Sequence, residues 1–329
     1  MTVAEILAGF SGVSALVVGD ICLDRWCTYD PATSEPSRET GIPRIGVVKT
    51  EVTPGGGATV ANNLAALKAK RVAVLGVSGD DGHGYELVGA LEARGISTEL
   101  LVRRAPVPTF AYTKLVNLLT GIEDQPRVDY VSTQPLPAGI EREILSRLES
   151  TVTGFDVIFV ADQAETGQGA ITPAVRSLVR DLAARYPSKL FWVDSRKHVD
   201  QFRGVVVKPN RQEADEACLR VFGQVDYERL REHIATGLMV VTMGSDGVLV
   251  IETGRTTRVE TAPAAHPVDI CGAGDSFSAG AAVALALTGS PVEAARFGNL
   301  IASITIMKKG TGTATPAEVL AAESSSGAR

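Results

Sequence analysis

Short apolar runs alternate with helical patterns along most of this chain of 329 residues, and this alternation constrains the fold more than any other feature. The runs predicted as strands cover residues 15–18, 71–75, 157–160, 190–193, 205–207, 238–242 and 247–251. Most of them are apolar throughout, which is typical of parallel strands that have helices on both faces. The helical patterns between them cover residues 58–68, 84–93, 139–150, 172–184, 211–219 and 227–235. This order predicts an α/β fold with three layers (α/β/α), in which helices cover both faces of a mostly parallel central sheet.

Two segments, 26–52 and 109–132, interrupt the alternation. Both have the mixed polar and apolar character of strands that are exposed on one face. A complete strand–helix–strand block separates them in the sequence, so we infer that they pair into one small β-sheet that covers a substrate cleft. The sequence therefore predicts a single domain over residues 1–323 that carries this small sheet as a lid. The small polar residues 324–329 are expected to form a disordered tail.

Charge and apolar content exclude several classes of protein. The chain has 38 acidic and 32 basic residues and no Lys/Arg cluster that would grip a phosphate backbone, so nucleic acid is not an expected partner. The apolar runs fall short of the roughly 18 residues that can span a bilayer, and the N-terminus lacks the pattern of a secretion signal. The four cysteines form no CxxC pair, so a structural zinc site is not expected. These observations predict a globular, cytoplasmic protein without a membrane anchor.

Glycine occurs 33 times, and several glycine-rich segments are candidates for phosphate binding. None of them matches the GxxxxGK[ST] pattern of P-loop NTPases or the GxGxxG fingerprint of dinucleotide-binding domains. The most informative segment contains Gly272, Ala273, Gly274 and Asp275 and precedes a run with helical character. Its backbone N–H groups would cradle an anion at the positive end of a helix, while Asp275 accepts the proton of a hydroxyl. This combination suits phosphoryl transfer, although an ordinary helix N-terminus with an acidic first turn gives the same pattern.

Two further motifs follow predicted strands. Asn210 and Glu213 lie where a helix begins, so their side-chain oxygens could organise a hydrated Mg²⁺ ion or could form a capping box. The segment with Thr242, Gly244 and Gly247 joins two strands. Its glycines would admit a nucleotide phosphate or ribose, but a plain hairpin explains them equally well.

Together these residues resemble the ribokinase-like (PfkB) family of carbohydrate kinases, over about residues 14–316. The family's two signatures correspond to residues 54–65, with the glycines that follow them, and to residues 269–275. The resemblance implies ATP and Mg²⁺ as cofactors, Asp275 as the catalytic base and Gly272–Gly274 as an anion hole. It further implies site residues of three kinds: Asp24, Gly55, Gly56 and Asn63 for the sugar, Asn210 and Glu213 for the metal, and Asn210, Thr242, Gly244, Gly247 and Asn299 for the nucleotide. In many members the lid also forms a homodimer contact.

Within the family, the chain is most similar to the heptose 7-phosphate kinase domain of the bifunctional heptose kinase/adenylyltransferase. Residues 19–26, 127–129 and 310–315 carry this likeness, whereas Asp194-Ser195-Arg196 replaces Asp-Pro-Lys. Arg38, Arg196 and Lys197 would supply the positive charge for a phosphorylated sugar. The expected acceptor is therefore a sugar or a sugar phosphate, with heptose 7-phosphate as one candidate. A nucleoside kinase of the same fold and a non-catalytic sugar-binding relative are the alternatives, and dependence on a monovalent cation stays open.

Overall fold

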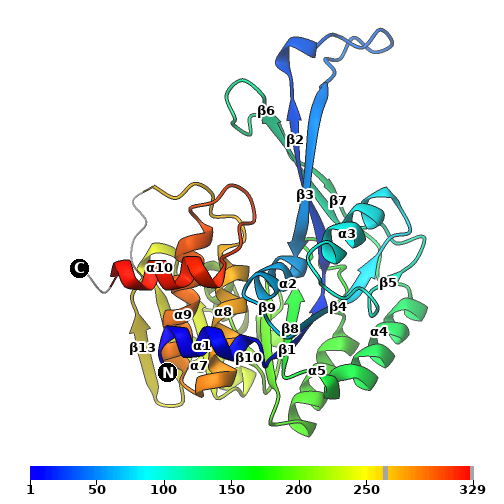
Figure 1. Cartoon of the computed structure of the whole chain (residues 1–329). Coiled ribbons are helices and arrows are strands. Elements are labelled where there is room, and N and C mark those ends of the chain that lie inside the picture. The colour runs from blue at the N-terminus through cyan, green and yellow to red at the C-terminus, as the bar shows by residue number, and fades with distance from the viewer. Residues whose placement is uncertain (262–265, 327–329) are drawn as a thin grey trace.

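A computed structural model describes residues 1–261 and 266–326, and its main body is built around one large sheet (Figure 1). Within the described residues this sheet has nine strands, in the order β13 (Arg255–Val259), β12 (Val248–Glu252), β11 (Leu238–Thr242), β10 (Val206–Val207), β9 (Leu190–Ser195), β8 (Val157–Asp162), β1 (Ser14–Gly19), β4 (Arg71–Ser78) and β5 (Val102–Arg103). Neighbouring strands are parallel except in the pairs β11–β12 and β12–β13, which are antiparallel. The predicted fold class is confirmed. Strand β13 escaped prediction because it lies at the edge of the sheet and is mostly exposed, so it lacks an apolar run.

Two apolar cores, one on each face of the large sheet, hold the helices in place. Alternate residues of β1 show the arrangement, because Ala15 and Val17 belong to one core and Leu16 and Val18 to the other. The helices are α1 (Val3–Phe10), α2 (Gly57–Ala66), α3 (Gly82–Glu92), α8 (Ala273–Thr288), α9 (Pro291–Thr305) and α10 (Pro316–Ser326) on one face, and α4 (Ala138–Thr151), α5 (Pro173–Arg185), α6 (Arg211–Phe222) and α7 (Tyr227–Ile234) on the other. Among the residues described, none of these helices combines the length and the apolar character that a membrane span requires.

The C-terminal end of the chain differs from its prediction. Disorder was expected from residue 324, but helix α10 continues to Ser326. The helix begins at Pro316 behind Thr315, whose hydroxyl and backbone N–H both donate to Glu318, and it packs on α9 and α1. In the last turn, the exposed hydroxyls of Ser324 and Ser325 donate to the backbone oxygens of Leu320 and Ala321, each at 2.9 Å. Residues 327–329 of the expected tail lie outside the described residues.

A second, smaller sheet projects from one end of the main body (Figure 1). Its strand order is β3 (Val47–Gly56), β2 (Ile21–Tyr29), β6 (Ala111–Asn117) and β7 (Val128–Tyr130). Strands β2 and β6 are parallel, whereas β3 and β7 pair antiparallel with their neighbours. The two interrupting segments therefore do form one sheet, as the sequence predicted. It is longer than expected, because β2 starts at Ile21, immediately after the end of β1.

The short connection between β1 and β2 joins the two sheets. Gly19 has a φ of 136°, and a Cβ on it would lie 2.1 Å from the backbone oxygen of Ala161. Only glycine fits this crossing. The buried carboxylate of Asp20 then accepts three backbone N–H groups from the loop after β8, at 2.8 Å from Gln163, 2.8 Å from Ala164 and 2.7 Å from Ala170. This network holds the loop after β8 against the base of the small sheet.

Candidate active site

An open cleft of about 620 Å³ lies between the small sheet and the carboxyl ends of the central strands. Open α/β sheets commonly bind ligands outside the carboxyl ends of their strands. The charged and aromatic side chains that line the cleft come from strands β2 and β6 of the small sheet, from the segments that precede β7 and follow β8 and β9, and from α8. They are Asp24, Trp26, Tyr112, Lys114, Arg127, Glu165, Arg196 and Asp275. The cleft thus brings the predicted base and the predicted sugar-binding carboxylate to one place.

The first turn of α8 forms one wall of this cleft. Gly272 precedes the helix with a φ of 77°, and a Cβ there would lie 3.1 Å from the Thr59 methyl group. Asp269 holds the loop that precedes the helix, because its carboxylate accepts the N–H of Cys271 at 2.9 Å and that of Gly310 at 3.1 Å. The N–H of Ala273 donates to the backbone oxygen of Ile270 at 3.2 Å, whereas the N–H groups of Gly274 and Asp275 have no partner within the helix. Asp275 occupies the same first turn, next to this candidate anion cradle.

The surroundings of Asp275 favour a proton acceptor that works near neutral pH. Burial raises the pKa of Asp275 to about 7, and the neighbouring Asp194 carboxylate adds to the rise. The positive charges of Lys208 and Arg196 act in the opposite direction. A general base is most effective when its pKa lies close to the working pH. The position and the pKa of Asp275 therefore both suit removal of a proton from a hydroxyl group.

A buried ion pair lies behind the first turn of α8 and was not assigned from the sequence. The Lys208 ammonium is 2.6 Å from the Asp194 carboxylate, and the two residues are only 3% and 7% exposed. Lys208 directly follows the apolar strand β10, and Asp194 is one residue from the end of β9. A charged residue that directly follows an apolar strand of a parallel sheet is a signal that could have indicated the pair.

The carboxylate of Asp24 projects from β2 beside the end of β3. An ideal Cβ on Gly55 would lie 2.5 Å from Oδ1 of Asp24, so the carboxylate occupies the space that any side chain at position 55 would need. Gly56, the last residue of β3, lines the cleft and has a φ of 53°. The structure thus brings these three predicted sugar-binding residues together.

Three positively charged side chains, Lys114, Arg127 and Arg196, line the same cleft, and we call them the cleft cations. Burial raises the pKa of Asp24 to about 6, against the opposing charges of the cleft cations. Arg196 donates to Glu165 at 2.8 Å and to Gln163 at 2.9 Å, which fixes its guanidinium at the rim. Of the cleft cations, only Arg196 had been considered as a source of charge for a phosphorylated sugar. Lys114 and Arg127 were missed because the arrangement of β6 and of the segment before β7 in the small sheet decides whether these side chains face the cleft.

Two predicted substrate residues lie elsewhere. Asn63 is completely buried within α2, where its amide donates to the backbone oxygen of Thr59 at 3.0 Å. Arg38 lies in the exposed loop between β2 and β3, and this loop forms the end of the small sheet that points away from the main body (Figure 1). Neither residue lines the cleft. The long β2–β3 hairpin carries position 38 outward, which the sequence motif could not reveal.

Asn210 and Glu213 form a capping box at the start of α6. The Asn210 side chain accepts the N–H of Glu213 at 2.9 Å, and the Glu213 carboxylate accepts the N–H of Asn210 at 2.8 Å. The capping alternative is therefore confirmed. Burial raises the pKa of Glu213 to about 7, with Asp194 adding to the rise and Lys208 opposing it. The second carboxylate oxygen of Glu213 is not used by this box.

Asn210 and Glu213 suit a hydrated magnesium ion but do not form a complete metal site. Among the described residues, no group of three or more His, Cys, Asp or Glu side chains is placed to hold a metal ion. Mg²⁺ commonly keeps several water ligands and binds through one or two carboxylates together with substrate phosphates. The free oxygen of Glu213 fits that mode, as a partner for a hydrated ion carried by a nucleotide.

The residues predicted to bind the nucleotide gather at the ends of strands β10 to β13. The N–H of Thr242 donates to Pro209 at 3.0 Å, and Thr242 also forms an isolated parallel bridge with Asn210. The turn after β11 is the short 3₁₀ helix Gly244–Asp246. A Cβ on Gly247 would lie 2.2 Å from the backbone oxygen of Val259, so Gly247 is required for packing on β13. Asn299 reaches the same region, where its amide donates to Glu260 at 3.3 Å.

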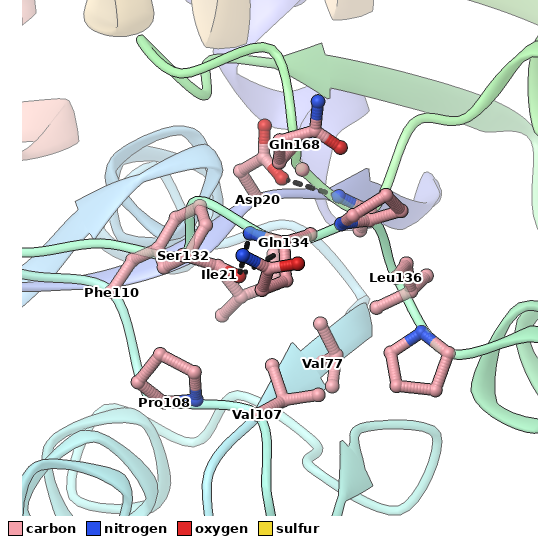
Figure 2. A pocket seen from close by; sticks show the side chains of 14 residues that line it. Asp20, Ile21, Val77, Val107, Pro108, Phe110, Ser132, Gln134, Leu136 and Gln168 are labelled. Carbon is pink, nitrogen blue, oxygen red and sulfur yellow. Dashed lines mark hydrogen bonds between the residues drawn. The ribbon is translucent and has the colours of Figure 1, made fainter.

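A second pocket lies at the base of the small sheet beside Asp20 (Figure 2). Apolar side chains, among them Ile21, Val77 and Leu136, form most of its lining. The Asp20 carboxylate at its edge is already engaged by the loop after β8, as Figure 2 shows for one of these hydrogen bonds. None of the predicted site residues lines this cavity.

Comparison with known proteins agrees with this geometry. Residues 204–318 match the pfkB family of carbohydrate kinases. The bifunctional protein HldE of Trichlorobacter lovleyi is 31% identical over 95% of this chain and 63% of its own length, and that of Caulobacter vibrioides is 32% identical over 98% and 66%. The chain thus spans less than two thirds of these relatives. Ribokinase of Thermotoga maritima superposes with a TM-score of 0.69 at 20% identity, covering 95% of this chain and 99% of its own. Phosphofructokinase-2 of Escherichia coli, solved with potassium, gives 0.71 at 18% identity, with the same coverage.

Proposed function

Because the chain belongs to the pfkB family of carbohydrate kinases, we propose that it transfers the γ-phosphate of ATP to a hydroxyl of a sugar or a sugar phosphate. The observation that carries the proposal is the position of Asp275 in the first turn of α8, beside the backbone N–H groups of Gly272 and Gly274 and in the same cleft as Asp24. Phosphoryl transfer depends mainly on positioning and on stabilising charge, and this wall of the cleft supplies both.

The proposed step is an in-line displacement at the γ-phosphorus. Asp24 accepts hydrogen bonds from sugar hydroxyls and orients the acceptor. The reacting hydroxyl loses its proton to Asp275 while its oxygen bonds to the γ-phosphorus, and the bond from that phosphorus to the bridging oxygen of ADP breaks. The N–H groups at the start of α8 stabilise the charge that develops on the transferred group. When bound, Mg²⁺ would neutralise part of the phosphate charge, and Glu213 would hold its water shell.

Potassium is a further candidate cofactor, because phosphofructokinase-2, which has the same fold, was solved in complex with it. The free thiols of all four cysteines agree with a reducing, cytoplasmic location for such a kinase. The formal charge of −6 gives no support to a nucleic-acid partner.

Release of ADP across a panel of acceptors tests the proposed function. We expect ADP release with ATP, Mg²⁺ and at least one free or phosphorylated hexose or heptose, and a weaker response to adenosine. Preference for adenosine would favour a nucleoside kinase. Absence of turnover with every acceptor, although ATP binds, would favour a non-catalytic relative. Repeating the assay in sodium and in potassium buffers measures any dependence on a monovalent cation.

We propose that the acceptor already carries a phosphate, and that heptose 7-phosphate is the first compound to test. The cleft cations Lys114, Arg127 and Arg196 line the cleft. Two relatives named bifunctional protein HldE are 31% and 32% identical to this chain over the aligned residues. Arginine is well suited to a phosphate because its guanidinium offers two parallel donors. The Arg196 guanidinium, half exposed at the rim, is oriented by Gln163 and Glu165.

Replacing Arg196 with glutamine is expected to raise KM for a phosphorylated acceptor about tenfold, since a hydrogen bond to a charged group contributes roughly 1.5–3 kcal/mol. The KM for the same sugar without its phosphate should change little. Steady-state kinetics with both acceptors provide the measurement. Arg185→Gln is the matched control, because Arg185 pairs with Glu149 on the helical face away from the cleft. An equal change for both acceptors would contradict a phosphate contact.

We also propose a homodimer through the small sheet. The two edge strands of this sheet expose large apolar side chains, Val47 and Val48 on β3 and Val128 and Tyr130 on β7, each between 44% and 55% exposed. Exposed apolar surface is typical of protein interfaces. Light scattering is expected to give twice the chain mass of 34.5 kDa. Val48→Glu should shift the protein to a monomer, and a monomeric wild type would contradict the proposal.

A further inference from the structure

The ammonium of Lys208 lies directly beneath the first turn of α8. An ideal Cβ on Gly274 would be 3.3 Å from its Nζ, so glycine at 274 lets the helix start approach the charge. The backbone N–H of Lys208 donates to Val193 at 2.8 Å, which fixes the residue between β9 and β11. Asp194 holds the ammonium at 2.6 Å. The buried cation is therefore held rigidly behind the candidate anion cradle.

This is an unfavourable place for a cation in the absence of an anion. The N-terminus of a helix is its positive end, so a buried ammonium there is repelled as well as desolvated. Although burial lowers it, the pKa of Lys208 is held above its ordinary value by the carboxylates of Asp194, Glu213 and Asp275. A lysine that only held strands together would gain nothing from contact with this helix end.

Lys208 also has donors to spare. An ammonium offers three N–H groups, and within the described ranges 1–261 and 266–326 Asp194 is the single hydrogen-bonding or ion-pair partner of its Nζ. The same ammonium packs against Gly274, one residue before the candidate base Asp275. The spare ammonium donors thus lie next to the helix start that forms one wall of the cleft, where a transferred phosphoryl group would carry its negative charge.

We propose that Lys208 is a catalytic residue that donates hydrogen bonds to the phosphoryl group as it moves from ATP to the acceptor, with Asp194 as its positioning residue. This inference rests on the proposed kinase function. In the step, the acceptor oxygen bonds to the γ-phosphorus, the bond to the bridging oxygen of ADP breaks and Asp275 takes the hydroxyl proton. Lys208 stays protonated throughout and stabilises the charge on the equatorial oxygens.

Replacing Lys208 with methionine, which keeps the length of the side chain, tests the proposal. We expect kcat to fall about 10²-fold with a nearly unchanged KM for the acceptor, because one preorganised donor at a transition state contributes about this much. The acid limb of the pH profile of kcat should move to higher pH, since a positive charge that lowers the pKa of Asp275 is lost. Lys208→Arg should retain more activity than Lys208→Met. A stable Lys208→Met with wild-type kcat and an unshifted profile would overturn the proposal.

Two further measurements separate this inference from folding and from the proposed function. The double variant Lys208→Met/Asp194→Asn removes both buried charges. It should therefore fold even if Lys208→Met alone does not, and its kcat should remain low.

Calorimetry compares the binding of ADP with that of a non-hydrolysable ATP analogue and needs no turnover. We expect Lys208→Met to bind the analogue about tenfold more weakly and ADP unchanged, whereas equal loss or no loss for both would overturn the contact. If the wild type binds the analogue but phosphorylates nothing, the proposed function fails and the Lys208 contact is still measured.

A matched control is available at the amino end of β9, whereas Asp194 lies near the carboxyl end of that strand. Lys189 is another lysine with a fixed ammonium, which donates to the backbone oxygen of Thr153 at 2.9 Å. Lys189→Met should lower the unfolding temperature without changing the pH profile or the preference between the two nucleotides.

Discussion

Replacing Asp275 with asparagine is expected to lower kcat by about 10³-fold, because a positioned general base contributes roughly 10²–10⁴-fold to a rate. Asparagine keeps the shape of the side chain but cannot accept the proton of the acceptor hydroxyl. The affinity for ATP should stay close to that of the wild type, because the backbone N–H groups of the α8 turn are unaffected. Steady-state kinetics measure the first effect and calorimetry the second. Unchanged turnover would remove Asp275 from the mechanism.

The pH dependence of the wild type provides an independent test of the same residue. Since burial raises the pKa of Asp275 to about 7, kcat should rise with pH up to about 7 and then level off. This acid limb reflects ionisation of the base, because only the carboxylate can accept a proton. Activity that is constant from pH 5 to 8 would contradict the assignment.

The raised pKa of Asp275 also predicts that this carboxyl group destabilises the folded protein near neutral pH. A carboxyl whose pKa is raised in the folded state from its ordinary value of 3.8 binds more protons folded than unfolded between the two values. The contribution of Asp275 to the free energy of unfolding therefore becomes increasingly unfavourable as the pH rises from about 4 to 7. Asp275→Asn should unfold at a higher temperature than the wild type at pH 8, with little difference at pH 4. Asp181→Asn is the matched control, because Asp181 is exposed on α5 and pairs with Arg180.

Replacing Asp24 with alanine is expected to lower kcat/KM for the acceptor by about 10³-fold. A carboxylate can accept two sugar hydroxyls, and each hydrogen bond to a charged group contributes roughly 1.5–3 kcal/mol. Nucleotide binding should be unchanged, because Asp24 lies on the small sheet, while the predicted nucleotide residues gather at the ends of β10 to β13. The measurement is kcat/KM for the acceptor at saturating ATP.

Gly55→Ala tests the same site without removing the carboxylate. Its Cβ would lie 2.5 Å from Oδ1 of Asp24, so the carboxylate must move out of its position. We expect a loss of kcat/KM that approaches that of Asp24→Ala. Asp30→Ala is the control, because Asp30 follows the same strand but only caps the short helix Pro31–Thr33. A fully active Gly55→Ala would show that Asp24 does not position the acceptor.

The local features of the fold and of the α8 motif were predictable from the sequence. Buried parallel strands carry apolar residues on both faces, so strands such as β1 and β8 were recognised from composition alone. The Asn210–Glu213 capping box and the Gly272–Asp275 helix start are each formed by residues close together in the sequence. Both motifs could therefore be located from the sequence, although the sequence did not distinguish a structural from a functional role. Strand β13 is exposed at the sheet edge, and α10 ends in a run of serines, so neither the strand nor the end of the helix had a sufficient local signal.

The sequence by itself determined an α/β fold with a lid, a helix start suited to an anion and a carboxylate in its first turn. Only the tertiary structure decided which charges meet there. It brought Lys208 and Asp194 together behind α8, placed the cleft cations near Asp24, and left Asn63 and Arg38 outside the cleft. The physical reason is that these charges sit on strands and loops far apart in the chain. Their proximity depends on strand order and on the crossing at Gly19, which no local pattern encodes.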